Sequence, residues 1–148
     1  MLRDTANRAP LLVADFLAAS IVQDTAGALV NNTFRVALRL RSVLPMGTIL
    51  CFTGLTGLET TDELVKIQGN ISEYTTQNGV WEKVPGRLNI TIAADVDAET
   101  LVILVFVFLN GRSEQVSPAI RIQTSGPLVI PPVLMLKVHD ANVSQKGR

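Results

Sequence analysis

The chain has 148 residues, of which 47% are hydrophobic, 18% charged and 5% aromatic. This length suits one domain with a substantial core, and the apolar content excludes an intrinsically disordered chain. Thirteen basic and thirteen acidic residues give a formal net charge of zero, which argues against nucleic-acid binding through a positively charged surface. Because a mean hydropathy of +0.33 is high for so few charges, we expect an unusually large core or a partly covered outer surface.

The first segment, residues 9–22, is ambiguous because its alanines permit a helix. Pro10 and the β-branched residues at its end favour an extended edge strand instead. Asp15 interrupts the apolar stretch, so the segment does not have the form of a signal peptide. If the protein is secreted, we expect its signal upstream of this segment.

Residues 33–41 alternate apolar side chains with polar ones, as a half-buried β-strand does. One face of this strand holds Phe34, Val36, Leu38 and Leu40. The opposite face holds Arg35, Arg39 and Arg41. In a chain of zero net charge we expect these arginines to be solvated or paired with acids.

The same period of two continues along the chain and predicts mainly short strands. With the first two segments, they are residues 11–22, 33–41, 48–53, 64–67, 80–84, 88–94, 101–109, 116–122 and 128–138. Turn signals separate them at Asn78-Gly79, Pro85-Gly86, Asn110-Gly111 and Ser125-Gly126-Pro127. This spacing predicts an all-β fold, an antiparallel immunoglobulin-like sandwich of seven to nine strands. We expect a single module over residues 1–148, with residues 1–8 and 139–148 as polar extensions.

Two segments, residues 101–109 and 128–136, are apolar on both faces. In an antiparallel sandwich one face of a strand normally meets water. Each segment is therefore either well covered within its own module or covered by a neighbour. Because Pro131 and Pro132 cannot donate ladder hydrogen bonds, the second segment should lie at a sheet edge or leave the sandwich. The nine residues of the first are about half of the ~20 that a membrane-spanning helix needs, so we expect no membrane insertion.

Four Asn-x-Ser/Thr sequons begin at Asn31, Asn70, Asn89 and Asn142. With eight Asn and twenty Ser or Thr in the chain, chance would give about one such motif, and four or more on the order of once in a hundred chains. Asn89 has the outward phase of its strand, and the other three fall in turns or a tail. We therefore expect covalent N-linked glycans, no other cofactor, and an extracellular location reached by a secretory route.

Catalytic and metal-binding signatures are not found in the sequence. The one histidine, His139, lies in a polar tail, and there is no nucleophile elbow, phosphate loop or Cys/His cluster. Asp95, Asp97 and Glu99 are expected to form a solvated turn, because the spaced glycine of a calcium loop is missing. We therefore expect no enzyme, no metal site and no nucleic-acid partner. Cys51 cannot form an internal disulfide, and we expect an ordinary strand residue there.

Residues 44–57, LPMGTILCFTGLTG, resemble the segment LPAGSTITISGLTGSQT of repeated β-sandwich modules in very large secreted proteins of algae and other protists. In the same order, residues 81–92, WEKVPGRLNITI, are similar to WNQATGTLTLTV. FVFLN at 106–110 and QVSPAI at 115–120 resemble FSFVLTNP and QSSPAV. The resemblance covers about residues 9–132 and implies a tandem module of fibrous or cell-surface glycoproteins, with no catalytic residues to carry over.

The chain departs from this family pattern where the family tends to place Thr or Ser on the outer face. Ile49, Cys51, Val105 and Val107 are apolar there, and Asn110-Gly111 replaces Asn-Pro. These departures favour an outer surface that a neighbour covers. The candidate interface residues are Ile49, Cys51, Leu101, Ile103, Val105, Val107, Leu128, Ile130, Pro131, Pro132 and Leu134.

The sequence thus predicts an extracellular structural module that stacks with copies of itself or with sister modules into a filament or surface coat. Either residues 127–138 or residues 9–22 would make the connection. In the first case, a chain without residues 127–148 should still fold but not assemble. Two alternatives remain open, a carbohydrate-binding or adhesive module and an accessory domain of a larger enzyme. A buried Trp81 would count against the first of them, and a Trp81 exposed beside Asp95 and Asp97 would favour it.

Overall fold

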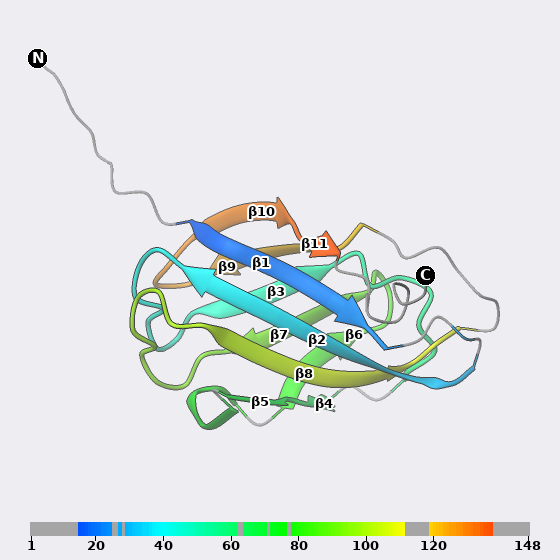
Figure 1. Cartoon of the computed structure of the whole chain (residues 1–148). Coiled ribbons are helices and arrows are strands. Elements are labelled where there is room, and N and C mark those ends of the chain that lie inside the picture. The colour runs from blue at the N-terminus through cyan, green and yellow to red at the C-terminus, as the bar shows by residue number, and fades with distance from the viewer. Residues whose placement is uncertain are drawn as a thin grey trace, which may run out of the picture.

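The computed structural model describes residues 15–24, 27, 29–61, 64–70, 72–76, 78–111 and 119–137. They form two β-sheets packed face to face, with one 3-10 turn (Ser72–Tyr74) as the only helical element of this part of the chain (Figure 1). All strand pairs are antiparallel except the pair of β1 with β11. The predicted all-β sandwich is confirmed.

The five-stranded sheet has the strand order β11-β1-β2-β8-β5. Its members are β1 (Phe16–Gln23), β2 (Asn31–Leu40), β5 (Gln68–Gly69), β8 (Val102–Leu109) and β11 (Leu136–Lys137). The six-stranded sheet has the order β10-β9-β3-β7-β6-β4. Its members are β3 (Ile49–Thr53), β4 (Leu64–Lys66), β6 (Asn78–Glu82), β7 (Arg87–Thr91), β9 (Arg121–Ser125) and β10 (Ile130–Leu134).

The described residues contain eleven strands, more than the seven to nine expected, because the chain crosses between the sheets at two places, directly after the predicted strand 64–67 and within the predicted strand 128–138. β4 lies in the six-stranded sheet and β5, two residues later, in the five-stranded one. β10 and β11 divide in the same way around Met135. Both β10 and β11 are edge strands, as the two prolines required. The ambiguous first segment is a strand, β1, and residues 9–14 lie outside the described residues, as do residues 116–118.

One turn prediction is wrong. Asn78 and Gly79 begin strand β6 and pair with Lys66 and Val65 of β4. A Cβ at Gly79 would lie 2.8 Å from Cδ1 of Leu88, so this glycine serves close packing rather than a turn. The turn at Pro85-Gly86 is confirmed: Gly86 has φ +97°, and a Cβ there would lie 2.6 Å from the carbonyl oxygen of Leu55. The bend at 126–128 is also where the sequence predicts it.

The strand phases read from the sequence define the core. On β2 the side chains of Phe34, Val36, Leu38 and Leu40 are buried, while Arg35, Arg39 and Arg41 are exposed. Five aromatic rings then join the two sheets. Phe106 lies 6.0 Å from Phe52 of the opposite sheet, and Phe108 lies 4.4 Å from Trp81, measured between ring centroids. Phe34 packs against both Phe106 and Phe108 at 5.8 Å, so these rings form one continuous cluster.

The C-terminal strands belong to this core as well. Ile130 and Met135 are each 2% exposed, β10 pairs with β9, and β11 pairs with β1. A chain without residues 127–148 would lose both side chains and both strands. We therefore correct the expectation that such a chain still folds.

Replacing Phe106 by alanine should lower the free energy of unfolding by about 3–5 kcal/mol, because the ring is fully buried and contacts three aromatic neighbours. Val107→Ala is the matched control, since its side chain points to the other side of the same strand, and we expect a loss of under about 1 kcal/mol. Urea unfolding followed by tryptophan fluorescence measures both. Equal losses for the two variants would contradict this account of the core.

Candidate interaction surface and glycosylation sites

The candidate interface residues do not form one surface. Leu101, Ile103, Val105 and Val107 lie on the outer side of the five-stranded sheet, because Val102, Leu104, Phe106 and Phe108 fill the inner side. Ile49 and Cys51 lie on the outer side of the six-stranded sheet. The remaining residues lie along the β10 edge: Leu128 is half-buried, and Pro131, Pro132 and Leu134 are exposed. Ile130 is wrong as an interface residue, because its side chain is in the core.

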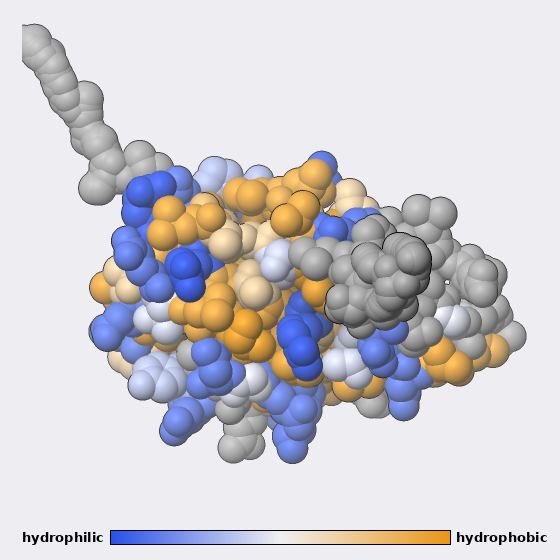
Figure 2. Space-filling view, viewed as in Figure 1, coloured by the Kyte–Doolittle hydropathy of each residue, from blue (hydrophilic) through white to orange (hydrophobic). Residues whose placement is uncertain are grey.

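The outer side of the five-stranded sheet carries a largely apolar surface, which we call the β8 face. Its apolar members are Ala18, Val22, Ala37, Leu101, Ile103, Val105, Val107 and Leu136. The register aligns Leu136, Ser20, Ala37 and Ile103 in one row across four strands. Ser20 and Ala37, in the middle of this row, have small side chains that project little from the sheet. Figure 2 shows this surface as an orange area over β1, β2 and β8 with hydrophilic side chains among it.

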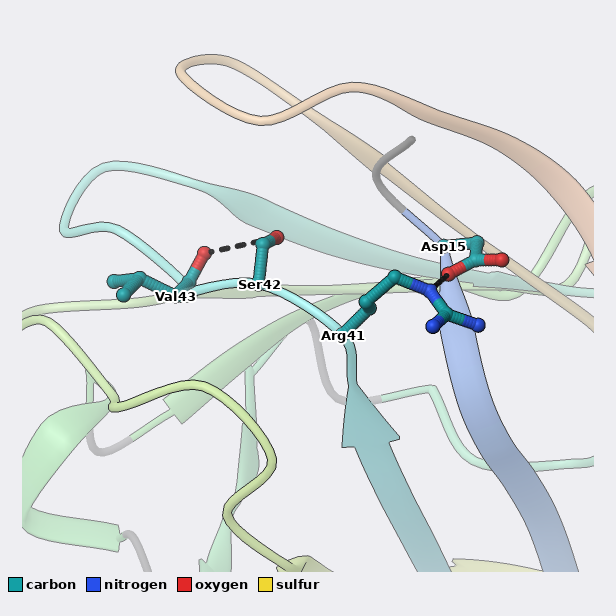
Figure 3. A network of polar contacts seen from close by, with 4 residues as sticks. All are labelled: Asp15, Arg41, Ser42 and Val43. Atoms are coloured by element: carbon teal, nitrogen blue, oxygen red, sulfur yellow. Dashed lines mark hydrogen bonds and ion pairs between the residues drawn. The ribbon is translucent and has the colours of Figure 1, made fainter. Parts of the chain in front are cut away.

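The charged groups within the β8 face are arginines. Arg35 lies between Val22 and Val105, and Arg39 is the partner of Ala18. Neither arginine makes an ion pair with a described residue. Arg41, the third arginine on this face of residues 33–41, donates from Nε to Oδ1 of Asp15 at 2.9 Å, at the end of the β1–β2 pair (Figure 3). Both partners of this pair are exposed, so we expect it to stabilise the fold by no more than ~1 kcal/mol.

Acidic side chains gather at the end of the sandwich where β2 stops. Asp95, Asp97 and Glu99 are exposed there, and the backbone N–H of Glu99 donates to the carbonyl of Leu40 at 2.9 Å. Met46, also exposed, donates its backbone N–H to Oδ1 of Asp95 at 2.7 Å. This acidic end therefore carries an apolar side chain and a charge opposite to that of the β8 face.

The outer side of the six-stranded sheet is more polar. Its side chains from the paired strands are Ile49, Cys51, Thr53, Leu64, Lys66, Asn78, Val80, Glu82, Arg87, Asn89, Thr91, Arg121, Gln123 and Ser125. Arg87 and Glu82 form an ion pair at the rim of this face, and the hydrogen bond to Glu82 raises the pKa of Arg87. The two outer sides of the sandwich thus differ: the β8 face is largely apolar, and the opposite face is mixed.

Cys51 lies in the middle of the mixed face but is buried. Burial raises the pKa of its thiol above the ordinary value; Arg87 opposes this rise, and Glu82 adds to it. The neutral thiol is the less nucleophilic form. Cys51 is thus poorly placed to bridge chains.

In the native protein we expect Cys51 to react with a thiol reagent at least about tenfold more slowly than in urea at pH 8, because the thiol is both covered and protonated. Because the pKa is higher in the native state, unfolding releases a proton between the unfolded and native pKa values. Stability should therefore fall as the pH rises through that interval. Reaction rates with Ellman's reagent and urea unfolding at several pH values measure the two effects. Equal rates in native and unfolded protein would contradict this assignment.

The sequon asparagines differ in what their amides do. Asn31 is exposed and Asn89 half-buried, each on the outer side of its sheet, and neither amide makes a hydrogen bond within the described part of the chain. Asn89 stands between Cys51 and Val80 in the register, at the middle of the mixed face. Asn70 is exposed, but its amide is bound to the main chain of β8. Asn142 and His139 lie outside the described residues.

Trp81, on which the carbohydrate-binding alternative depends, lies in the core. Trp81 is 3% exposed, and its Nε1–H donates to the carbonyl of Thr60 at 2.9 Å, so it offers no stacking platform for a sugar. Tyr74 is exposed. Over the described ranges, no group of three or more His, Cys, Asp or Glu side chains lies close enough to hold a metal ion. The buried Trp81 counts against the carbohydrate-binding alternative.

One polar cluster was not predicted from the sequence. The amide of Asn32, fully buried, donates to Oε1 of Gln23 at 2.8 Å and to Oδ1 of Asn110 at 3.0 Å. Oδ1 of Asn32 accepts from the backbone N–H of Asp24 at 3.0 Å, and Asn110 donates to the carbonyl of Gly27 at 2.7 Å. These bonds tie the ends of β1, β2 and β8 together. The predicted strand began at residue 33, so the sequence indicated neither the burial of Asn32 nor its partners.

No protein-family model matches the chain, and no curated protein matches its sequence. Within the described ranges, no helical segment has the length and apolar character that spanning a bilayer requires.

Proposed function

We propose that this protein is an extracellular, N-glycosylated structural module that stacks with copies of itself or with sister modules into a filament or surface coat. The observation that carries the proposal is the β8 face. Leu101, Val107 and Leu136 are 44%, 45% and 66% exposed on it, although each is a large apolar side chain. Contiguous apolar surfaces of this kind usually mark an interface with another molecule.

The charges on the surface favour a head-to-tail contact over a two-fold one. A two-fold contact through the β8 face would bring Arg35 and Arg39 of one copy towards the same arginines of the other. The acidic end with Asp95, Asp97 and Glu99 offers the opposite charge together with the apolar Met46. A contact between two different surfaces of the same module repeats without closing, and so generates a filament.

The sugars complement this arrangement. A glycan on Asn89 would cover the middle of the mixed face, over Cys51 and Val80, and keep that side in solvent. A glycan on Asn31 would lie at the far end of the β8 face, opposite Leu109. The sequons and the likeness of residues 44–57 to repeated secreted modules both support the extracellular location.

Changing both Leu101 and Val107 to lysine should prevent assembly, because two charges would have to be buried in the contact. The matched control is the double change of Leu64 and Val80 to lysine. These residues are the same types at similar exposure, 57% and 48%, on the other sheet. Negative-stain imaging and sedimentation of secreted protein would read out assembly. We expect filaments for the wild type and the control and dispersed modules for the β8-face variant, both variants having native circular dichroism.

Filaments from the β8-face variant, or loss of filaments in the control alone, would contradict the assignment of the stacking surface. Dispersed wild-type modules at every concentration reached in the native material would contradict the structural function itself.

A further inference from the structure

The side-chain amide of Asn70 takes the place of main-chain hydrogen-bonding groups at the edge of β8, just beyond the end of β5. Its backbone N–H donates to the carbonyl of Ile103 at 3.1 Å, as the next residue of strand β5 would. Its Oδ1 then accepts from the backbone N–H of Ile103 at 2.8 Å, and its Nδ2 donates to the carbonyl of Leu101 at 2.7 Å. The amide thus supplies the donor and acceptor that a longer β5 would supply.

β5 is only two residues long, so it leaves the edge of β8 before Leu104 without a main-chain partner strand. Gln68 and Gly69 pair with Val105 and Leu104, and from Ile103 back to Leu101 the edge of β8 is satisfied by Asn70. An unpaired strand edge is a site for unwanted pairing with other chains. Figure 1 shows β5 as the short strand beside β8 at the border of the sheet.

A glycan on Asn70 is incompatible with these contacts. Oδ1 and Nδ2 of Asn70 both bond to the same strand, so Oδ1 and the donated hydrogen point in the same general direction. Of the two hydrogens on Nδ2, the donated one is therefore the one on the same side of the C–N bond as Oδ1. In an N-glycosylated asparagine the amide is secondary and adopts the trans form, as a peptide bond does. The sugar carbon then occupies the position of that hydrogen, and the cis alternative is strongly disfavoured. The bond to Leu101 would be lost, and the sugar would be directed at the strand.

We propose that Asn70 is an edge-closing residue whose amide is bare in the folded module, and that the sugars of the described sequons are carried by Asn31 and Asn89. The amides of these two make no competing hydrogen bond to a described residue and lie on outward phases of their strands. This inference deepens the proposed function. The backbone partners of Asn70 belong to Leu101 and Ile103, whose side chains lie on the β8 face, so the bare amide closes the strand edge that borders this face.

Two variants separate the amide from the sequon. Asn70→Ala removes the hydrogen bonds and the sequon together, whereas Ser72→Ala removes only the sequon. Each is made in bacteria, without N-glycans, and as secreted protein from eukaryotic cells. We expect Asn70→Ala to lower the melting temperature by about 3–6 °C from both sources, because two hydrogen bonds are lost. We expect Ser72→Ala to melt within about 1 °C of the wild type from both sources.

Site occupancy gives the second readout. Enzymatic removal of N-glycans in ¹⁸O water converts each glycosylated asparagine of the secreted wild type to labelled aspartate, which peptide mass spectrometry locates. We expect the label at Asn31 and Asn89 and not at Asn70. Label at Asn70 in folded protein would overturn the proposal, as would equal melting of Asn70→Ala and wild type in the bacterial material.

These outcomes are distinct from failure of the proposed function. The bacterial arm tests the edge contact in protein that carries no sugar, and both melting experiments are done on dispersed modules. An Asn70→Ala effect in bacterial protein together with no label at any sequon would keep the edge role and overturn the assignment of sugars to Asn31 and Asn89. A secreted wild type that carries label at Asn31 and Asn89 but forms no filaments would support this inference and contradict only the stacking function.

Discussion

Phe106 and Phe108 pack between the two sheets and hold them together. These rings contact Phe52 and Trp81 of the opposite sheet, and so they fix which side of β8 faces the core. Because side chains alternate along a strand, Val105 and Val107 must then face outwards. A slip of one residue would exchange the two sets. The apolar excess of the sequence is therefore divided between a core and an outer face.

The two outer sides of the sandwich have different chemistry. The β8 face has large apolar side chains and arginines without ion-pair partners among the described residues, and the mixed face has polar side chains around Asn89. In the proposed function the first side meets a neighbouring module and the second carries a sugar. Only 18% of the residues are charged. Covalent glycans would add the solubility that charged side chains usually provide. High hydropathy, low charge and several sequons then have one common explanation.

The sequence predicted what depends on the alternation of side chains and did not predict what depends on partners far away in the chain. The phase of residues 33–41 identified the core side of β2 correctly. Residues 101–109 are apolar on both faces, so their phase did not identify a core side; the outward positions of Val105 and Val107 came from the resemblance to repeated modules, and the structure places both outside. The crossing of β4–β5 and β10–β11 between sheets was missed, since it is decided by where the opposite edges lie. Ile130 was placed at the interface as part of the segment 128–136, which is apolar on both faces, whereas its side chain fills the core.

Glycine and asparagine were the residues whose roles the sequence described least well. Asn78-Gly79 has the form of a turn, but Gly79 is needed where Leu88 approaches the backbone. Asn32 and Asn70 look like the asparagines of a polar surface. One is buried in an amide network, and the other completes the edge of β8. Both roles depend on residues more than thirty positions away, and a local motif does not contain them.

In the assembled protein we expect a neighbouring module to cover the β8 face. Hydroxyl-radical footprinting of native assembled material against dissociated modules measures this directly, because leucine and valine side chains are labelled according to their exposure. We expect Leu101 and Val107 to be protected in the assembly while Leu64 and Val80 keep their labelling. Unchanged labelling of Leu101 and Val107 on assembly would contradict it.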